Sequence, residues 1–131
     1  MKITKDFPGL KYEDGIYKFD GSILTAEALQ IELDSWLFVS GSIEAGHGIK
    51  AGDGIKAGHG IEAGWGIEAG LSIKCKILFA RYFVFAGLAI WKKAEGEDMV
   101  VECEKLEADV KYGTVRILQA TKKPKKTENA D

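Results

Sequence analysis

A hexapeptide repeats five times without interruption between residues 43 and 72, and no other feature constrains the fold as strongly. The run reads IEAGHG IKAGDG IKAGHG IEAGWG IEAGLS. A short fixed period is typical of a solenoid, in which each repeat stacks on its neighbours and a continuous core is buried. Within a hexad, Ile, a charged residue and Ala alternate, which predicts a short strand with its aliphatic side chains inside. We therefore expect an all-β chain, a β-solenoid of stacked short coils.

Large apolar residues recur at six-residue steps on both sides of the run, which extends the expected solenoid to residues 31–91. These positions are Ile31, Leu37, Ile43, Ile49, Ile55, Ile61, Ile67, Ile73, Phe79, Phe85 and Trp91. The open ends of a strand stack need covering. Residues 1–30 are therefore predicted to form an amino-terminal cap and residues 92–120 a set of carboxyl-terminal capping strands, such as a hairpin. Residues 121–131 are polar and predicted to be a flexible tail.

The Gly-x-Gly sequence that ends most hexads predicts the corners of the coil. Ten of the sixteen glycines lie in residues 41–70. Glycine accepts a positive φ without steric penalty, so we expect it to turn the chain between strands. In the inward small-residue column, Cys75 takes the place of alanine and is predicted to be a buried, inert thiol.

The outward charges predict how many hexads make one coil. With twelve residues per coil, the stacked pairs are Glu44–Lys56, Lys50–Glu62, Lys56–Glu68 and Glu62–Lys74, all of opposite sign. With eighteen, they are Glu44–Glu62, Lys50–Glu68 and Lys56–Lys74, and two of the three pairs are like-charged. Opposite charges on neighbouring strands stabilise by about 0.2–1 kcal/mol and like charges are unfavourable. This comparison favours a flat solenoid with two hexads per coil.

Length and composition indicate one domain that is not a general nucleic-acid binder. The chain has 131 residues and a formal net charge of −2, whereas such binders carry a basic excess. Direct nucleic-acid binding is therefore not expected. The amino terminus has no signal-like apolar segment, and the most apolar stretch, residues 77–91, is short for a membrane span and contains Arg81. We expect a cytoplasmic protein with free thiols and no membrane contact.

The candidate functional residues lie on the outside of the predicted coils. His47 and His59 fall on adjacent rungs of a twelve-residue coil, but two exposed ligands make a poor metal site, so no metal or cofactor is predicted. Trp65 is either packed on its neighbours or a binding anchor. The aromatic cluster of residues 79–85 is either core or a dimer or partner interface. No phosphate-binding loop, zinc spacing or nucleophile elbow occurs, which argues against an enzyme.

The repeat style, IxAGxG, resembles that of small proteins from phages and mobile elements, over about half of the chain. Such proteins include inhibitors that occlude a host surface, among them anti-CRISPR proteins. The resemblance implies a non-enzymatic binding protein that inhibits a host defence complex such as CRISPR–Cas through a rigid charged surface. The partner-binding residues expected for this function are Glu44, Glu62, Glu68, Trp65, His47 and His59.

Two alternatives remain open. One is a structural protein that assembles end to end, as other open-ended β-helices do. The other is an enzyme like the hexapeptide acyltransferases, which this chain resembles in period. Their small inward residue lies four positions after the aliphatic one, where this chain has His47, Asp53, His59, Trp65 and Leu71. A histidine would serve as general base in such an enzyme.

Overall fold

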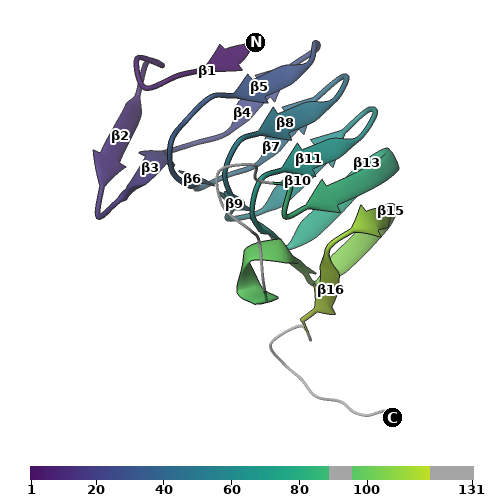
Figure 1. Ribbon diagram of the computed structural model, residues 1–131. Coiled ribbons are helices and arrows are strands. Elements are labelled where there is room, and N and C mark those ends of the chain that lie inside the picture. Colours follow the sequence, from purple (N-terminus) through teal and green to yellow (C-terminus); the bar gives the residue numbers. More distant parts are fainter. Residues whose placement is uncertain (89–95, 119–131) are drawn as a thin grey trace.

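The computed structural model describes residues 1–88 and 96–118. It confirms the predicted β-solenoid, whose strands follow one another as stacked coils from one end of the molecule to the other (Figure 1). The expected inward position of Trp91 and the tail of residues 121–131 lie outside the described residues.

Each coil has three sides, because the parallel strands stack in three sets. Face 1 contains β4 (Ile23–Thr25), β7 (Ile43–Ala45) and β10 (Gly60–Ala63). Face 2 contains β5 (Leu29–Ile31), β8 (Ile49–Ala51) and β11 (Ile67–Ala69). Face 3 contains β3 (Ile16–Phe19), β6 (Leu37–Val39), β9 (Ile55–Ala57), β12 (Ile73–Lys74) and β14 (Val100–Cys103).

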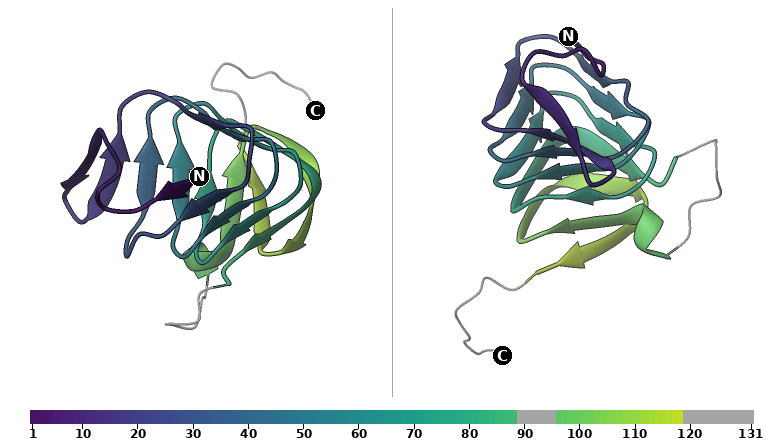
Figure 2. Two further views of the ribbon diagram at one scale, coloured as in Figure 1. Left: turned by 90° about the horizontal axis from the view of Figure 1, so that it is seen from above. Right: turned by 90° about the vertical axis from the view of Figure 1, so that its left-hand side faces the viewer.

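The remaining elements extend or close these faces (Figure 2). The long strand β13 (Ile77–Ala86) pairs first with β10 and then with β11, so it continues face 1 and turns onto face 2. The other elements are β1 (Lys2–Ile3) beside β5, β2 (Leu10–Glu13) beside β3, β15 (Lys105–Tyr112) beside β13, β16 (Thr114–Ile117) beside β14, and the 3₁₀ helix η1 (Gly96–Met99).

The central coils contain three hexads, so the expectation of two hexads per coil is wrong. Ile61 pairs with Ile43, and Glu62 lies beside Glu44 rather than beside Lys50. The corner geometry explains this result, because none of the glycines between residues 22 and 86 has a positive φ. Corners without positive φ bend the chain gently, whereas a sharp reversal into a two-sided coil favours residues with positive φ. Three gentle corners close the coil.

In four of the five hexads the first corner glycine is required by close approach between coils rather than by φ, which corrects the expected role of these residues; Gly52 is the exception. A Cβ atom on Gly64 would lie 2.1 Å from the carbonyl oxygen of Gly46, and one on Gly58 would lie 2.2 Å from that of Ser40. The same contact brings the corner backbones into hydrogen-bond range, since the Gly64 amide donates to the Ala45 carbonyl at 3.0 Å. The hydrogen-bond ladder therefore continues around these corners.

The core is a stack of isoleucines and small residues. Ile61, Ile67 and Ile73, one from each face, are each at most 1% exposed, and each pairs with an isoleucine of the coil before. Complete burial of each such side chain stabilises the fold by about 1.5–3 kcal/mol. The alanines two residues later face inward as predicted, where larger side chains would overfill a narrow interior.

The coil that leads into β13 has one residue fewer, and this reverses the expected orientation of the aromatic cluster. Ile61 pairs with Leu78 and Ile67 with Val84, both seventeen residues ahead. A one-residue shift turns every side chain of a strand to its other face. Phe79 is therefore 36% exposed, and Phe85 lies outside beside Glu68. The inward isoleucine column therefore does not continue to Phe79 and Phe85, and of the two alternatives for the aromatic cluster, core or interface, these two side chains are not core.

The stack of parallel strands reaches beyond residues 31–91 at both ends. At the amino end it includes β1 and β3, which pair in parallel with β5 and β6. At the carboxyl end it continues through β14, β15 and β16, which pair in parallel with earlier strands and do not form the expected hairpin. A hairpin occurs at the amino end instead, where β2 pairs antiparallel with β3 across a two-residue loop, Asp14–Gly15. Both loop residues have positive φ, as tight hairpins of this length require.

Candidate binding faces

Three hexads per coil give each face its own outward column of side chains. Face 1 presents Leu24, Glu44, Glu62, Phe79 and Glu107 in successive coils. Face 2 presents Gln30, Lys50, Glu68, Phe85 and Tyr112. Face 3 presents Lys18, Phe38, Lys56, Lys74, Glu102 and Arg116. Although the net charge of the chain is close to zero, the charges are segregated between the faces, with carboxylates on face 1 and lysines on face 3.

Face 1 holds a pair of adjacent carboxylates with no cationic partner. Glu44 and Glu62 lie side by side and are both exposed. Neither forms an ion pair with any residue in the described part of the chain. A shallow groove of about 280 Å³ runs between them and His59, with Ser42 and Phe79 among its other lining residues.

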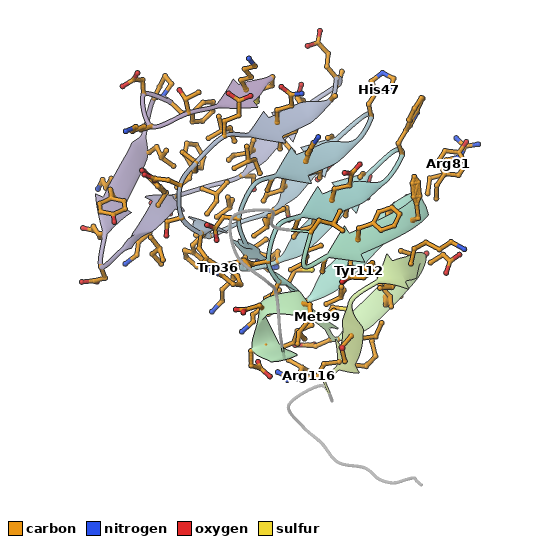
Figure 3. The ribbon with its side chains drawn as sticks, in the orientation of Figure 1. Trp36, His47, Arg81, Met99, Tyr112 and Arg116 are labelled. Atoms are coloured by element: carbon orange, nitrogen blue, oxygen red, sulfur yellow. The ribbon has the colours of Figure 1, made fainter. Side chains whose placement is uncertain are left out.

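Exposed aromatic side chains line the corner between faces 1 and 2. Trp65 is 58% exposed and meets the His47 ring edge-on, with 5.7 Å between ring centroids. Tyr82 follows on the next coil, where its amide donates to the Trp65 carbonyl at 3.0 Å. The Arg81 guanidinium lies 5.6 Å from the Tyr82 ring centroid, so a cation is added to this aromatic corner (Figure 3). We call residues His47, Trp65, Arg81 and Tyr82 the aromatic corner.

The six residues predicted to bind a partner are brought together in part. Glu44, Glu62 and His59 line the groove on face 1. Trp65 and Glu68 line a second groove, of about 190 Å³, on face 2. The aromatic corner, which includes His47, lies between these two faces, so five of the six predicted residues lie on or beside this edge of the solenoid. His59 lies at the opposite edge of face 1, between β9 and β10.

The two histidines do not stack on each other, so their expected placement on adjacent rungs is wrong. His47 stacks on Trp65, whereas the His59 backbone pairs with Gly41 on one side and Lys76 on the other. The eighteen-residue coil places them at different corners. Among residues 1–88 and 96–118, no group of three or more His, Cys, Asp or Glu side chains could hold a metal ion.

Sequence reasoning missed the basic and aromatic surface of face 3. Lys56 and Lys74 lie on adjacent strands, and Trp36 and Phe38 are half-buried between them and Lys18. Together with Ile16 these five side chains line a groove of about 460 Å³. The signal was present as lysines eighteen residues apart, which a twelve-residue coil assigns to opposite sides of the solenoid.

Two polar clusters fasten the ends of face 3. The Tyr17 hydroxyl donates a 2.6 Å hydrogen bond to Asp34, which raises the Tyr17 pKa to about 12 and lowers that of Asp34.

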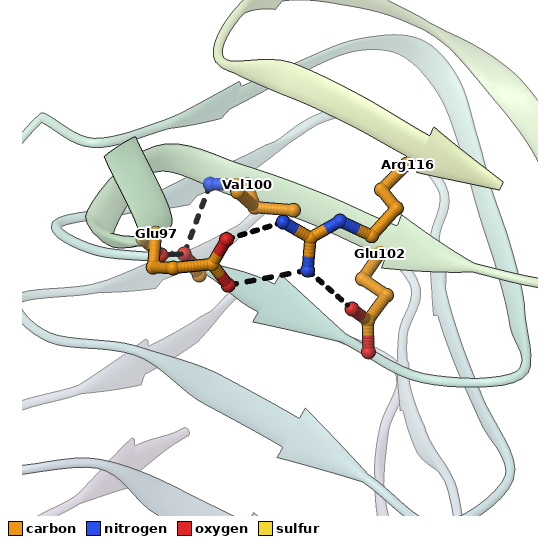
Figure 4. Close-up of polar contacts among 5 residues, drawn as sticks. Glu97, Val100, Glu102 and Arg116 are labelled. Atoms are coloured by element: carbon orange, nitrogen blue, oxygen red, sulfur yellow. Dashed lines mark hydrogen bonds and ion pairs between the residues drawn. The ribbon is translucent and has the colours of Figure 1, made fainter. Parts of the chain in front are cut away.

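The cluster at the other end of face 3 is centred on Arg116, whose guanidinium bonds to Glu97 and Glu102 (Figure 4). Hydrogen bonds to Arg116 lower the Glu97 pKa, and the same contacts raise the pKa of Arg116. The buried Ser72 hydroxyl donates to the Glu97 carbonyl and accepts from the Val100 amide at 2.9 Å.

The two cysteines are free and chemically protected. Cys75 packs against the core, and burial, with a smaller contribution from Cys103, raises its pKa to about 12. Burial also raises the pKa of Cys103. A thiol with such a pKa is protonated at neutral pH and is a poor nucleophile. The packing agrees with the structural role predicted for Cys75, although its side chain is only partly enclosed.

Comparison with known proteins gave no match: no family model, curated protein or solved structure is significantly similar to this chain. Among the described residues, no helix has the length and apolar character needed to cross a membrane. The arguments for function therefore rest on the faces themselves.

Proposed function

We propose that this chain is a non-enzymatic binding protein that engages a protein partner through face 1 and the aromatic corner. The observation that carries the proposal is the adjacent pair Glu44–Glu62, exposed and without a cationic partner in the described residues. Like charges opposite each other on neighbouring strands destabilise a sheet. Because the pair lowers the stability of the sheet, we attribute it to binding of a basic partner.

The aromatic corner adds the residue types that contribute most of the binding free energy in protein interfaces. Exposed tryptophan, tyrosine and arginine are the residue types most enriched among binding hot spots, and Trp65, Tyr82 and Arg81 occur here in adjacent coils. Leu24, Ile77 and Phe79 add exposed apolar area on face 1. A hydrogen-bonded solenoid loses little conformational entropy on binding, which favours affinity.

We further propose that the partner is a host macromolecular complex in the cytoplasm, which the chain inhibits by occlusion. Support for this step comes from the resemblance of the repeat to small phage and mobile-element proteins, and from the exposed carboxylates and aromatic side chains of face 1 and the aromatic corner. A host defence complex such as CRISPR–Cas is the partner this resemblance suggests. Such complexes expose basic surfaces for nucleic acid, and face 1 offers the complementary charge.

Affinity capture with matched variants tests the proposal. The full chain is immobilised, partners are captured from host lysate, and the affinity of the identified partner is then measured with purified components. We expect E44K/E62K to weaken binding at least ten-fold, and W65A about thirty-fold, as a central aromatic anchor does. The control E13K/E32K makes the same charge change at exposed sites away from face 1. Equal binding by E44K/E62K and E13K/E32K would refute the proposal.

An acyltransferase-like enzyme is a second candidate, supported by the eighteen-residue coil, which is the coil length of the hexapeptide enzymes. His59 would be the base, since it shares a groove with Glu44 and Glu62. Thioester hydrolysis that is lost in H59A and kept in H47A would support this function. End-to-end assembly has less support, because β15 carries two ion pairs, Lys105–Glu107 and Lys111–Asp109, and charged edge strands oppose strand addition.

A further inference from the structure

Face 3 combines cations and aromatic rings in one row, and this combination points to a ligand that face 1 would repel. Lys18, Phe38, Lys56 and Lys74 follow one another on successive strands. At a strand spacing of about 4.8 Å, the row from Lys18 to Lys74 spans roughly 14 Å. Its groove, about 460 Å³, is the largest of those described on the three faces.

One of the two rings of this groove, the Trp36 indole, packs closely against the backbone. Trp36 lies flat on Gly54, where a Cβ atom would come within 2.3 Å of the indole. The Lys74 ammonium lies 5.8 Å from the Trp36 ring, and the Lys56 ammonium lies 5.8 Å from the Phe38 ring. Contacts at this distance on an exposed surface are weak, so the lysines are free to turn toward a stronger anionic partner.

Two lysines of the groove are not held in ion pairs. Lys18 is 3.6 Å from Glu13 and 3.9 Å from Asp14, and Arg116 is paired with Glu97 and Glu102. Lys56 and Lys74 form no ion pair with any described residue. Glu97 lies close enough to Lys74 for their charges to interact, and Glu102 is the neighbour of Lys74 on the next strand. The carboxylates therefore bound the groove at its ends and leave its centre basic.

We propose that face 3 binds single-stranded nucleic acid, with Lys56 and Lys74 on the phosphates and Trp36 and Phe38 stacking on bases. Positively charged grooves with aromatic platforms are how proteins bind single strands without sequence preference. A duplex hides the flat faces of its bases, and an acidic peptide offers no rings to stack, so neither uses Trp36 and Phe38 as fully. The net charge of −2 argued against such a ligand. The separation of charge by face removes that argument.

Fluorescence anisotropy with the full chain and a labelled 12-nucleotide oligothymidylate tests the charges. K56Q/K74Q removes the two lysines and their mutual repulsion, and K50Q/K105Q makes the same charge change on faces 1 and 2. We expect K56Q/K74Q to lose at least ten-fold in affinity at low salt and K50Q/K105Q to bind like the parent. Each phosphate contact contributes about −0.7 to the slope of log affinity against log salt. The slope should therefore become shallower by about 1.4 in K56Q/K74Q.

Intrinsic tryptophan fluorescence tests the stacking and separates the possible ligands. Oligothymidylate should quench the fluorescence of the parent, and W36F should lose that part of the quenching while it keeps a ring in the groove. Poly-glutamate and a 12-base-pair duplex serve as competitors. Equal affinity of K56Q/K74Q and K50Q/K105Q for the oligonucleotide would overturn the proposal. So would poly-glutamate or duplex binding tighter than the single strand with no change in W36F, which would assign face 3 to an acidic protein or to a duplex.

Discussion

At the scale of single residues, the repeat glycines illustrate how a correct pattern was given the wrong cause. The sequence marks the corners, and the glycines do lie there, but their φ values are ordinary. At Gly46, Gly58, Gly64 and Gly70, what excludes a side chain is a carbonyl of the previous coil. Which carbonyl approaches a given glycine depends on which residues stack. The amino-acid sequence does not reveal that stacking until the number of residues per coil is known.

The corner glycines make a matched pair of substitutions informative. Gly64→Ala should destabilise the fold by about 1–3 kcal/mol or more, because its Cβ would lie 2.1 Å from the Gly46 carbonyl oxygen. Gly52→Ala meets nothing within 4 Å at an ordinary φ and should be neutral or stabilise by up to about 1 kcal/mol. Urea unfolding of both variants measures the difference. Similar midpoints for the two would contradict the close-approach explanation.

The hydrogen bond between Tyr17 and Asp34 predicts a pH dependence. It lowers the Asp34 pKa in the folded state, so it stabilises the fold above the unfolded pKa, near 4, and this contribution is lost as pH falls through the folded value. Tyr17→Phe should lower the urea midpoint at pH 7. The difference between Tyr17→Phe and the parent should shrink between pH 5 and pH 2. A difference that stays constant over this range would show that the carboxylate is not involved.

At the scale of strands and coils, the sequence predicted which side chains face inward and failed on how the coils stack. Ile and Ala columns are read directly from the alternation, because burial of Ile43 or Ile61 outweighs every surface effect. The number of hexads per coil was judged from exposed charges, each worth less than about 1 kcal/mol. That preference is too small to oppose the geometry of the corners. The coil that leads into β13 is one residue shorter than the others, and a search at fixed six-residue intervals does not detect this.

The observed stacking predicts that a charge reversal on face 1 stabilises the fold. In Glu62→Lys the new ammonium lies beside Glu44, so we expect a gain of about 0.2–1 kcal/mol that falls as salt is added. In a twelve-residue coil the same substitution would place the cation between Lys50 and Lys74 and would destabilise. Unfolding of Glu62→Lys with and without Glu44→Gln isolates the pairwise term. A destabilising pairwise term would contradict the eighteen-residue coil.

At the scale of the whole molecule, stability should grade from the centre of the stack to its ends. The central strands β7 to β11 each have a neighbour on both sides, whereas in the described structure β1, β2 and β16 each pair with one strand. Local opening therefore needs the least free energy at the ends. The candidate faces share this gradient, because Glu44, Glu62, Lys56 and Lys74 belong to central coils and the aromatic corner begins there.

Hydrogen exchange measures this gradient. Amides of residues 43–74 should exchange most slowly, and those of β1, β2 and β16 should exchange fastest, by several orders of magnitude if the ends fray independently. The Ser72 hydroxyl, which accepts a hydrogen bond from the Val100 amide, should slow exchange in β14 relative to β16. Uniform protection along the chain would show that the solenoid opens only as a unit.

The interior of the repeat run cannot distinguish one hexad from the next, because all five offer the same isoleucine and nearly the same small residues. A duplication of six nucleotide triplets within the run would therefore leave the core intact while it rotated every later coil by one face. A new hexad between Glu44 and Glu62 would separate the glutamate pair, and one between Lys56 and Lys74 would move Lys74 onto a neighbouring face. A lineage that carries such a repeat can redraw its surface in a single genetic event and keep its fold.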